Sequence, residues 1–119
     1  MGLKVLVVDD DQSFQQLMEV TLLLEPAVGD VRVAGDGPEA LEICRQFHPD
    51  LVFVDSLLPQ MTGDEVSEQL RESFPKVRVV SLSGVQDSNG SGTGDRLEKS
   101  AATVDDVRRV VADTQSKLS

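Results

Sequence analysis

The chain has 119 residues, a length that suits one domain with a sizeable core, and we expect residues 1–119 to fold as a single unit. Its 11 basic and 21 acidic residues give a formal charge of −10, so phosphate backbones and anionic lipids would repel it, and we expect direct binding neither to nucleic acid nor to membranes. No apolar stretch approaches the roughly 20 residues of a membrane span, and the N-terminus lacks the pattern of a signal peptide, which predicts a cytoplasmic protein.

Apolar runs alternate along the chain with segments of helical periodicity, a pattern typical of a parallel sheet covered by helices on both faces. We expect strands near 4–8, 31–34, 51–54, 77–82 and, as the weakest, 96–98. Helices are expected at about 13–25, after a turn at 36–39, at 64–73 and at 104–117. The fold class is therefore α/β, a doubly wound sheet of five parallel strands.

Each expected helix repeats apolar residues at helical spacing. The first, which Asp11 or Ser13 caps and Pro26 stops, has a shared face made of Phe14, Leu17, Met18, Thr21 and Leu24. The inward residues of the other three are Ala40, Leu41, Cys44 and Phe47, then Val66 and Leu70, and finally Val107, Val110 and Val111 behind an N-cap at Thr103.

Two residues that often carry chemistry are interpreted here as structural. Cys44 has no second cysteine to pair with, and its helical spacing favours a small buried apolar side chain over a redox site. His48 has neither a second histidine nor a nucleophile pattern around it, so we place it at the end of the second helix.

The segment between Val85 and Leu97 has a different composition from the rest of the chain. It contains no large apolar residue and is dominated by Gly, Ser and Asn, so a helix there would have poor propensity and no face to bury. We expect an irregular, mobile loop.

Acidic residues follow two of the expected strands. Asp9, Asp10 and Asp11 come after an apolar run, and Asp55 ends another. The carboxyl ends of strands in an open parallel sheet form the ligand-binding edge, so these carboxylates should meet there. Such an oxygen-rich pocket suits Mg²⁺.

The order of further residues carries a resemblance. After the acid pair and Asp55 come Pro59 and Gly63, then the hydroxyl of Ser83 at the end of a strand, then Lys99. This order over nearly the whole chain resembles the receiver domain of two-component response regulators. The resemblance implies a flavodoxin-like sheet with strand order 2-1-3-4-5 and makes Asp55 the phosphoacceptor.

The resemblance also implies roles for the remaining site residues. Asp10 would bind Mg²⁺ directly and Asp9 through a metal-bound water, while Asp55 and the backbone carbonyl of Leu57 complete the protein ligands. The hydroxyl of Ser83, the ammonium of Lys99 and the backbone amides of Ser56 and Gly84 would contact the phosphoryl oxygens.

Three departures from the family concern the readout of the site. The Gly- and Ser-rich segment stands where the family has its fourth helix, so that helix is expected to be missing or degenerate. Arg96 replaces a common aromatic residue. Ser100 replaces the proline after the lysine, and because a cis bond without proline costs roughly 2.5 to 4 kcal/mol, we expect a trans Lys99–Ser100 peptide.

The leading functional hypothesis is a monomeric receiver domain that accepts a phosphoryl group from a histidine kinase or phosphotransfer protein and passes the signal to an unknown downstream protein. Such a domain is not an enzyme in the usual sense, because it catalyses only its own phosphorylation and dephosphorylation. The main alternative is a pseudo-receiver, a protein-interaction module that keeps the acids without using them. A small enzyme or nucleotide binder is disfavoured, because no credible phosphate loop occurs.

Overall fold

The computed structural model of the protein describes residues 2–83, 95–98 and 104–118. Its centre is a parallel sheet of five strands in the order β2-β1-β3-β4-β5. The strands are β1 (Leu3–Val8), β2 (Val28–Ala34), β3 (Leu51–Asp55), β4 (Arg78–Ser83) and β5 (Asp95–Glu98). Helices α1 (Gln12–Leu23), α2 (Gly37–Phe47), α3 (Gly63–Ser73) and α4 (Val104–Leu118) connect or follow them. The predicted fold class and strand order are confirmed.

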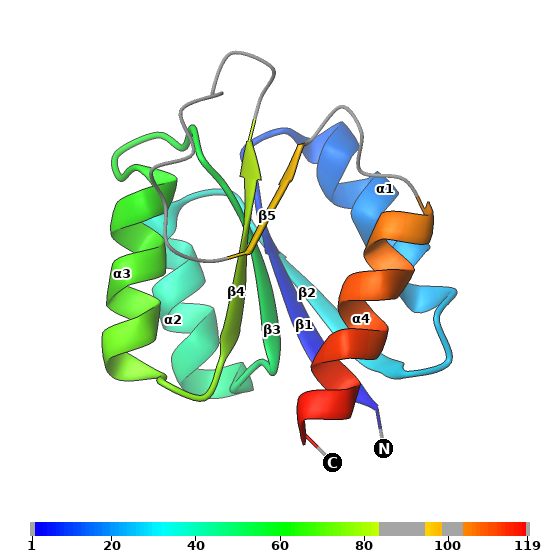
Figure 1. Ribbon diagram of the computed structural model, residues 1–119. Coiled ribbons are helices and arrows are strands. Elements are labelled where there is room, and N and C mark those ends of the chain that lie inside the picture. The colour runs from blue at the N-terminus through cyan, green and yellow to red at the C-terminus, as the bar shows by residue number, and fades with distance from the viewer. Residues whose placement is uncertain (1, 84–94, 99–103, 119) are drawn as a thin grey trace.

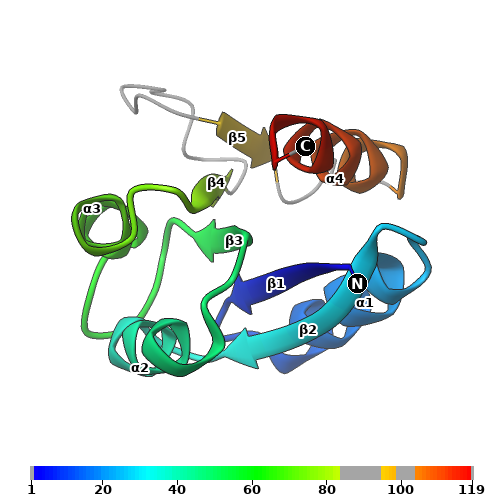
Figure 2. The same ribbon diagram turned by 90° about the horizontal axis from the view of Figure 1, so that it is seen from below.

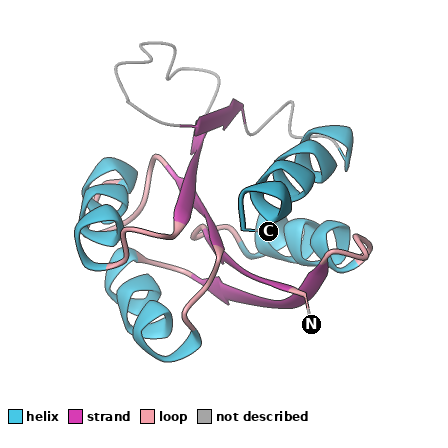
Figure 3. Ribbon diagram, turned by 60° about the horizontal axis from the view of Figure 1, so that its bottom comes forward, coloured by secondary structure: helices cyan, strands magenta, loops and turns pink. Residues whose placement is uncertain are grey.

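The helices lie in two layers on either side of the sheet. Helices α2 and α3 cover one face, and α1 and α4 cover the other (Figures 1 and 2). Figure 3, which is coloured by secondary structure, shows the strands running between these two layers of helices. Because both faces are covered, the sheet separates two apolar cores, one beneath α1 and α4 and one beneath α2 and α3.

The central strands explain why the site can form at the edge of the sheet. All residues of β1 from Val5 to Val8 and of β3 from Leu51 to Val54 are fully buried, as expected for strands between two helical layers. Val8 pairs with Val54 in parallel register, so the residues that follow these two strands leave the sheet side by side. The residues next in sequence are Asp9 and Asp55.

Helix α1 differs from its prediction in length and in the face that it buries. It ends at Leu23 rather than at 25, because Glu25, the residue before Pro26, is disfavoured in helical conformation and its N–H donates to the carbonyl of Leu22 in a tighter turn. Its buried residues are Met18, Thr21 and Leu22, whereas Leu17 and Leu24 of the predicted face are 59% and 69% exposed.

The other elements follow the predictions closely, with small shifts at their ends. Strand β2 begins at Val28, three residues before the predicted start, and β4 ends at Ser83 instead of 82. The predicted inward residues Cys44, Leu70 and Val107 are buried. His48 is the C-cap of α2 with a left-handed φ of 52°, which confirms its placement at the helix end.

The segment in place of the fourth helix is only partly within the described ranges. Strand β5 begins at Asp95, one residue before the predicted start at 96, so Asp95 belongs to the sheet and not to the predicted loop. The rest of that loop, from 86 to 94, lies outside the described residues. The Lys99–Ser100 peptide and the Thr103 cap lie outside them too.

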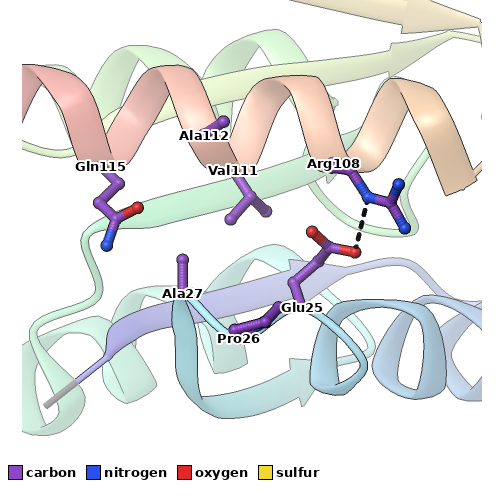
Figure 4. Close-up of a pocket in the computed structure, with 7 residues that line it drawn as sticks. All are labelled: Glu25, Pro26, Ala27, Arg108, Val111, Ala112 and Gln115. Carbon is purple, nitrogen blue, oxygen red and sulfur yellow. Dashed lines mark hydrogen bonds and ion pairs between the residues drawn. The ribbon is translucent and has the colours of Figure 1, made fainter.

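A surface cavity of about 360 Å³ lies between the end of α1 and helix α4, where Glu25 and Arg108 form an ion pair at 3.2 Å (Figure 4). The side chain of Glu25 is 8% exposed and that of Arg108 is 62% exposed, so a nearly buried carboxylate is paired with a cation at the surface. This contact ties α4 to the α1–β2 connection.

In the described part of the chain, no helix has the length and apolar character needed to cross a membrane.

Candidate functional site

Three carboxylates meet where β1 and β3 end. Asp9 and Asp55 are buried, at 0% and 5% exposure, and Asp10 is exposed. One oxygen from each of the three lies within 4.8 Å of the others. The predicted convergence of Asp9, Asp10 and Asp55 at one edge of the sheet is therefore confirmed as geometry.

This donor set fits a small divalent cation. Carboxylates at this separation repel one another, and water screens that repulsion less where two of the three are buried. A cation among them would remove that repulsion. Carboxylate oxygens are the hard ligands that Mg²⁺ prefers, and Mg²⁺ usually takes few protein ligands and keeps several waters.

The first turn of α1 holds the acidic segment. The backbone N–H of Asp11 donates to Oδ1 of Asp9 at 2.9 Å. Asp11 in turn is the N-cap of α1, and its own carboxylate accepts from the N–H groups of Ser13 and Phe14. The cap expected at Asp11 or Ser13 is thus Asp11, which means that this acid orients the helix and Asp9 at the same time.

Gln15 adds a second link between α1 and the strand ends. Its side-chain Nε2 donates to the backbone carbonyl of Asp9 and, at 3.2 Å, to that of Ala34, the last residue of β2. The N–H of Asp9 also donates to Ala34, at 2.9 Å. Sequence analysis did not identify Gln15. A polar side chain one turn beyond a helix cap was the one available signal.

The connection that follows Asp55 is held by backbone hydrogen bonds. The N–H of Leu57 lies 3.3 Å from Oδ1 of Asp55 and donates to it, a contact that sequence analysis did not anticipate. The N–H of Ser56, which the resemblance assigns to a phosphoryl oxygen, donates instead to the carbonyl of Leu82 at 2.9 Å. The Ser56 N–H could donate to a phosphoryl oxygen only if its hydrogen bond to the Leu82 carbonyl were broken.

The start of α3 packs closely beneath Asp55. The N–H of Gly63 donates to the carbonyl of Ser56 at 3.2 Å, which closes the loop from β3 to α3. Thr62 caps α3 in a reciprocal arrangement with Glu65, so the loop ends in a rigid helix start. The connection between the phosphoacceptor candidate and α3 is therefore short and fixed at both ends.

The remaining predicted residues lie at the same edge or outside the described ranges. In the register of β3 with β4, Asp55 pairs with Leu82, so Ser83 is the next residue along the neighbouring strand. Ser83 pairs in turn with Glu98, the last residue of β5. Gly84 and Lys99 lie outside the described residues, and their predicted contacts stay predictions.

Comparison with known proteins gives a consistent family match. A family model described as the response regulator receiver domain matches residues 5–107. The DNA-binding response regulator MtrA of Mycolicibacterium paratuberculosis is 39% identical over 85 residues, which cover 71% of this chain and 36% of MtrA. The transcriptional regulatory protein DegU of Brevibacillus brevis is 30% identical over 81 residues, covering 68% of this chain and 34% of DegU. The chain thus spans about a third of the length of these relatives.

Solved structures of receiver domains are similar to this chain over nearly its full length. The REC domain of AraT, a response regulator from Geobacillus stearothermophilus, has a TM-score of 0.87 at 28% identity, with 99% of this chain and 96% of that chain covered. The receiver domain of the Francisella response regulator 1452 has a TM-score of 0.85 at 26% identity, with 99% and 100% covered.

Proposed function

Because this chain belongs to the family of response regulator receiver domains, we propose that Asp55 accepts a phosphoryl group from a phosphohistidine. The observation that carries this proposal is the meeting of three carboxylates within 4.8 Å, with Asp55 at the end of a buried central strand. A pseudo-receiver is less favoured, because nothing about an interaction module alone requires three acids to be held together at the cost of their repulsion.

The proposed reaction transfers a phosphoryl group from the ring nitrogen of the donor histidine to the carboxylate of Asp55. A carboxylate oxygen of Asp55 attacks phosphorus, the new O–P bond forms an acyl phosphate, and the P–N bond to the donor histidine breaks with return of the electron pair to the ring nitrogen. Asp9, Asp10, Asp55 and the carbonyl of Leu57 would hold Mg²⁺, which supplies positive charge to the phosphoryl oxygens. The domain would catalyse this phosphoryl transfer to its own Asp55 and, later, the hydrolysis of the acyl phosphate.

The other polar groups would orient the phosphoryl group. The hydroxyl of Ser83 and the backbone amides of Ser56 and Gly84 would donate to its oxygens, and the ammonium of Lys99 would pair with one of them. The N–H of Leu57 already donates to Asp55 at 3.3 Å and so restrains the carboxylate that attacks.

The proposed partners are proteins. A histidine kinase or phosphotransfer protein would be the donor, and a downstream protein, or a further domain of the same polypeptide, would receive the signal. A formal charge of −10 argues against contact between residues 1–119 and nucleic acid, although the relative MtrA is described as DNA-binding. Residues 1–119 would act as a single receiver unit in the cytoplasm.

The test is phosphorylation by acetyl phosphate with Mg²⁺, followed by intact-protein mass spectrometry. The wild type should gain the mass of one phosphoryl group, and Asp55→Asn should gain none because an amide is not a competent nucleophile. Asp64→Asn is the matched control, since Asp64 is an exposed acid at the start of α3. Labelling of Asp55→Asn would assign the phosphate to another residue, and no labelling of the wild type would favour the pseudo-receiver.

A further inference from the structure

The side chain of Gln15 reaches from α1 to the ends of two strands at once. Its Nε2 group donates both to the carbonyl of Asp9, after β1, and to the carbonyl of Ala34, which ends β2. Gln15 also belongs to the first turn of its helix, where its backbone N–H donates to the carbonyl of Asp11 at 3.0 Å. One residue therefore joins the helix start, the acidic segment and the edge of the sheet.

From this geometry we propose that Gln15 is a positioning residue for the metal site, acting through the Asp9–Asp10 peptide. A peptide group is planar, so fixing the Asp9 carbonyl also fixes the orientation of the Asp10 N–H and the position of the Asp10 Cα. The proposal rests on the function proposed above, because it assumes that the three acids bind Mg²⁺.

This one contact matters because Asp9 and Asp10 are oriented in different ways. The carboxylate of Asp9 is oriented separately, by the N–H of Asp11 at 2.9 Å, and Asp9 is fully buried. Asp10 is exposed, and its orientation relies on the backbone that carries it. Loss of the Gln15 amide would therefore disturb Asp10 more than Asp9 and would widen the spacing of the three carboxylates.

The matched variants are Gln15→Met and Gln16→Met. Methionine has nearly the length of glutamine but no N–H donor, so Gln15→Met removes the two hydrogen bonds with little change in volume. Gln16 is an exposed neighbour on the same helix. The same substitution there controls for the change in helix composition. Gln15→Asn is a second variant that keeps the amide but shortens the side chain by one methylene group.

The measurement is Mg²⁺ affinity by isothermal titration calorimetry, with the melting temperature of each metal-free variant recorded beside it. We expect the dissociation constant to rise about tenfold or more for Gln15→Met, to rise by a smaller factor for Gln15→Asn, and to stay unchanged for Gln16→Met. A purely structural role for Gln15 predicts the other result: a lower melting temperature with the wild-type affinity, which would overturn the proposal.

A second readout does not depend on bound metal. In NMR spectra of the Mg²⁺-free protein, the Asp10 amide resonance should move in Gln15→Met and stay in place in Gln16→Met, because the Asp9 carbonyl and the Asp10 N–H share one peptide. An unmoved Asp10 amide would overturn the positioning role by itself. Failure of the wild type to bind Mg²⁺, with a moved Asp10 amide in Gln15→Met, would instead locate the error in the proposed metal site.

Discussion

Gly63 packs directly against the backbone of Asp55. A Cβ atom at Gly63 would overlap the carbonyl oxygen of Asp55 and would lie 2.7 Å from the Cα of Ser56. Backbone atoms at such a distance cannot move aside as a flexible side chain can. The absence of a side chain at Gly63 is therefore what allows α3 to begin beneath the phosphoacceptor candidate.

The first prediction follows from this close approach. Gly63→Ala should lower the free energy of unfolding by about 1 to 3 kcal/mol, because the added methyl group forces the β3–α3 connection apart. It should also slow phosphorylation of Asp55 by acetyl phosphate. Urea denaturation and mass spectrometry measure the two effects. Gly35→Ala is the control, since a Cβ there would meet only the Glu39 side chain, at an ordinary 3.7 Å. Equal stability of the two variants would contradict the prediction.

The second prediction concerns the ion pair between Glu25 and Arg108. Arg108→Gln should lower the free energy of unfolding by about 1 to 2 kcal/mol, because it leaves a carboxylate of 8% exposure without its cation, while the exposure of Arg108 limits the loss. Arg109→Gln removes an ion pair on the same helix between Arg109, which is 71% exposed, and Asp106, which is 26% exposed, and should change stability by less than about 0.5 kcal/mol.

A double-mutant cycle identifies the cause of the Arg108 effect. Adding Glu25→Gln to Arg108→Gln removes the buried charge, so part of the lost stability should return. Additive losses in urea denaturation would show that the two side chains act independently.

The third prediction uses the buried thiol on α2. Burial raises the pKa of Cys44 from 9.0 to about 11, because the thiolate is poorly solvated inside the core. The folded-state pKa lies above the unfolded one, so this contribution to stability is complete below pH 9 and is lost as the pH rises through 11. Urea denaturation at pH 8 and pH 11 should show the wild type losing roughly 2 kcal/mol more than Cys44→Ala. The same loss in both proteins would mean that Cys44 does not titrate in this way.

The fourth prediction concerns the attachment of α4 to the sheet through Arg78. This side chain is 16% exposed, pairs with Asp113 at 3.0 Å, and donates to the carbonyl of Val110 and the hydroxyl of Thr114. Arg78→Met keeps the apolar stem but removes these bonds, and it should cost about 2 to 3 kcal/mol in the free energy of unfolding. Lys76→Met, at an exposed position nearby, should be close to neutral in the same urea denaturation series. A neutral Arg78→Met would show that the apolar contacts of α4 suffice.

The sequence by itself determined the sheet and its acidic edge. Fully apolar runs such as 51–54 are a local property of the chain, and a buried parallel strand is the structure that accommodates them. Once two such strands are neighbours in a parallel sheet, the acids that follow them must emerge together. Asp9, Asp10 and Asp55 could therefore be identified before any coordinates.

The tertiary structure decided the orientation of α1 and the hydrogen bonds around the acids. Leu17, Met18, Leu22 and Leu24 are all apolar, so the sequence pattern allows more than one inward face, and packing against β2 and α4 selects Met18 and Leu22. That same rotation of the helix points Gln15 at the strand ends. Periodicity cannot reveal a side-chain bond to two backbone carbonyls, one of them 19 positions away at Ala34, because such a bond exists only when three elements have already come together.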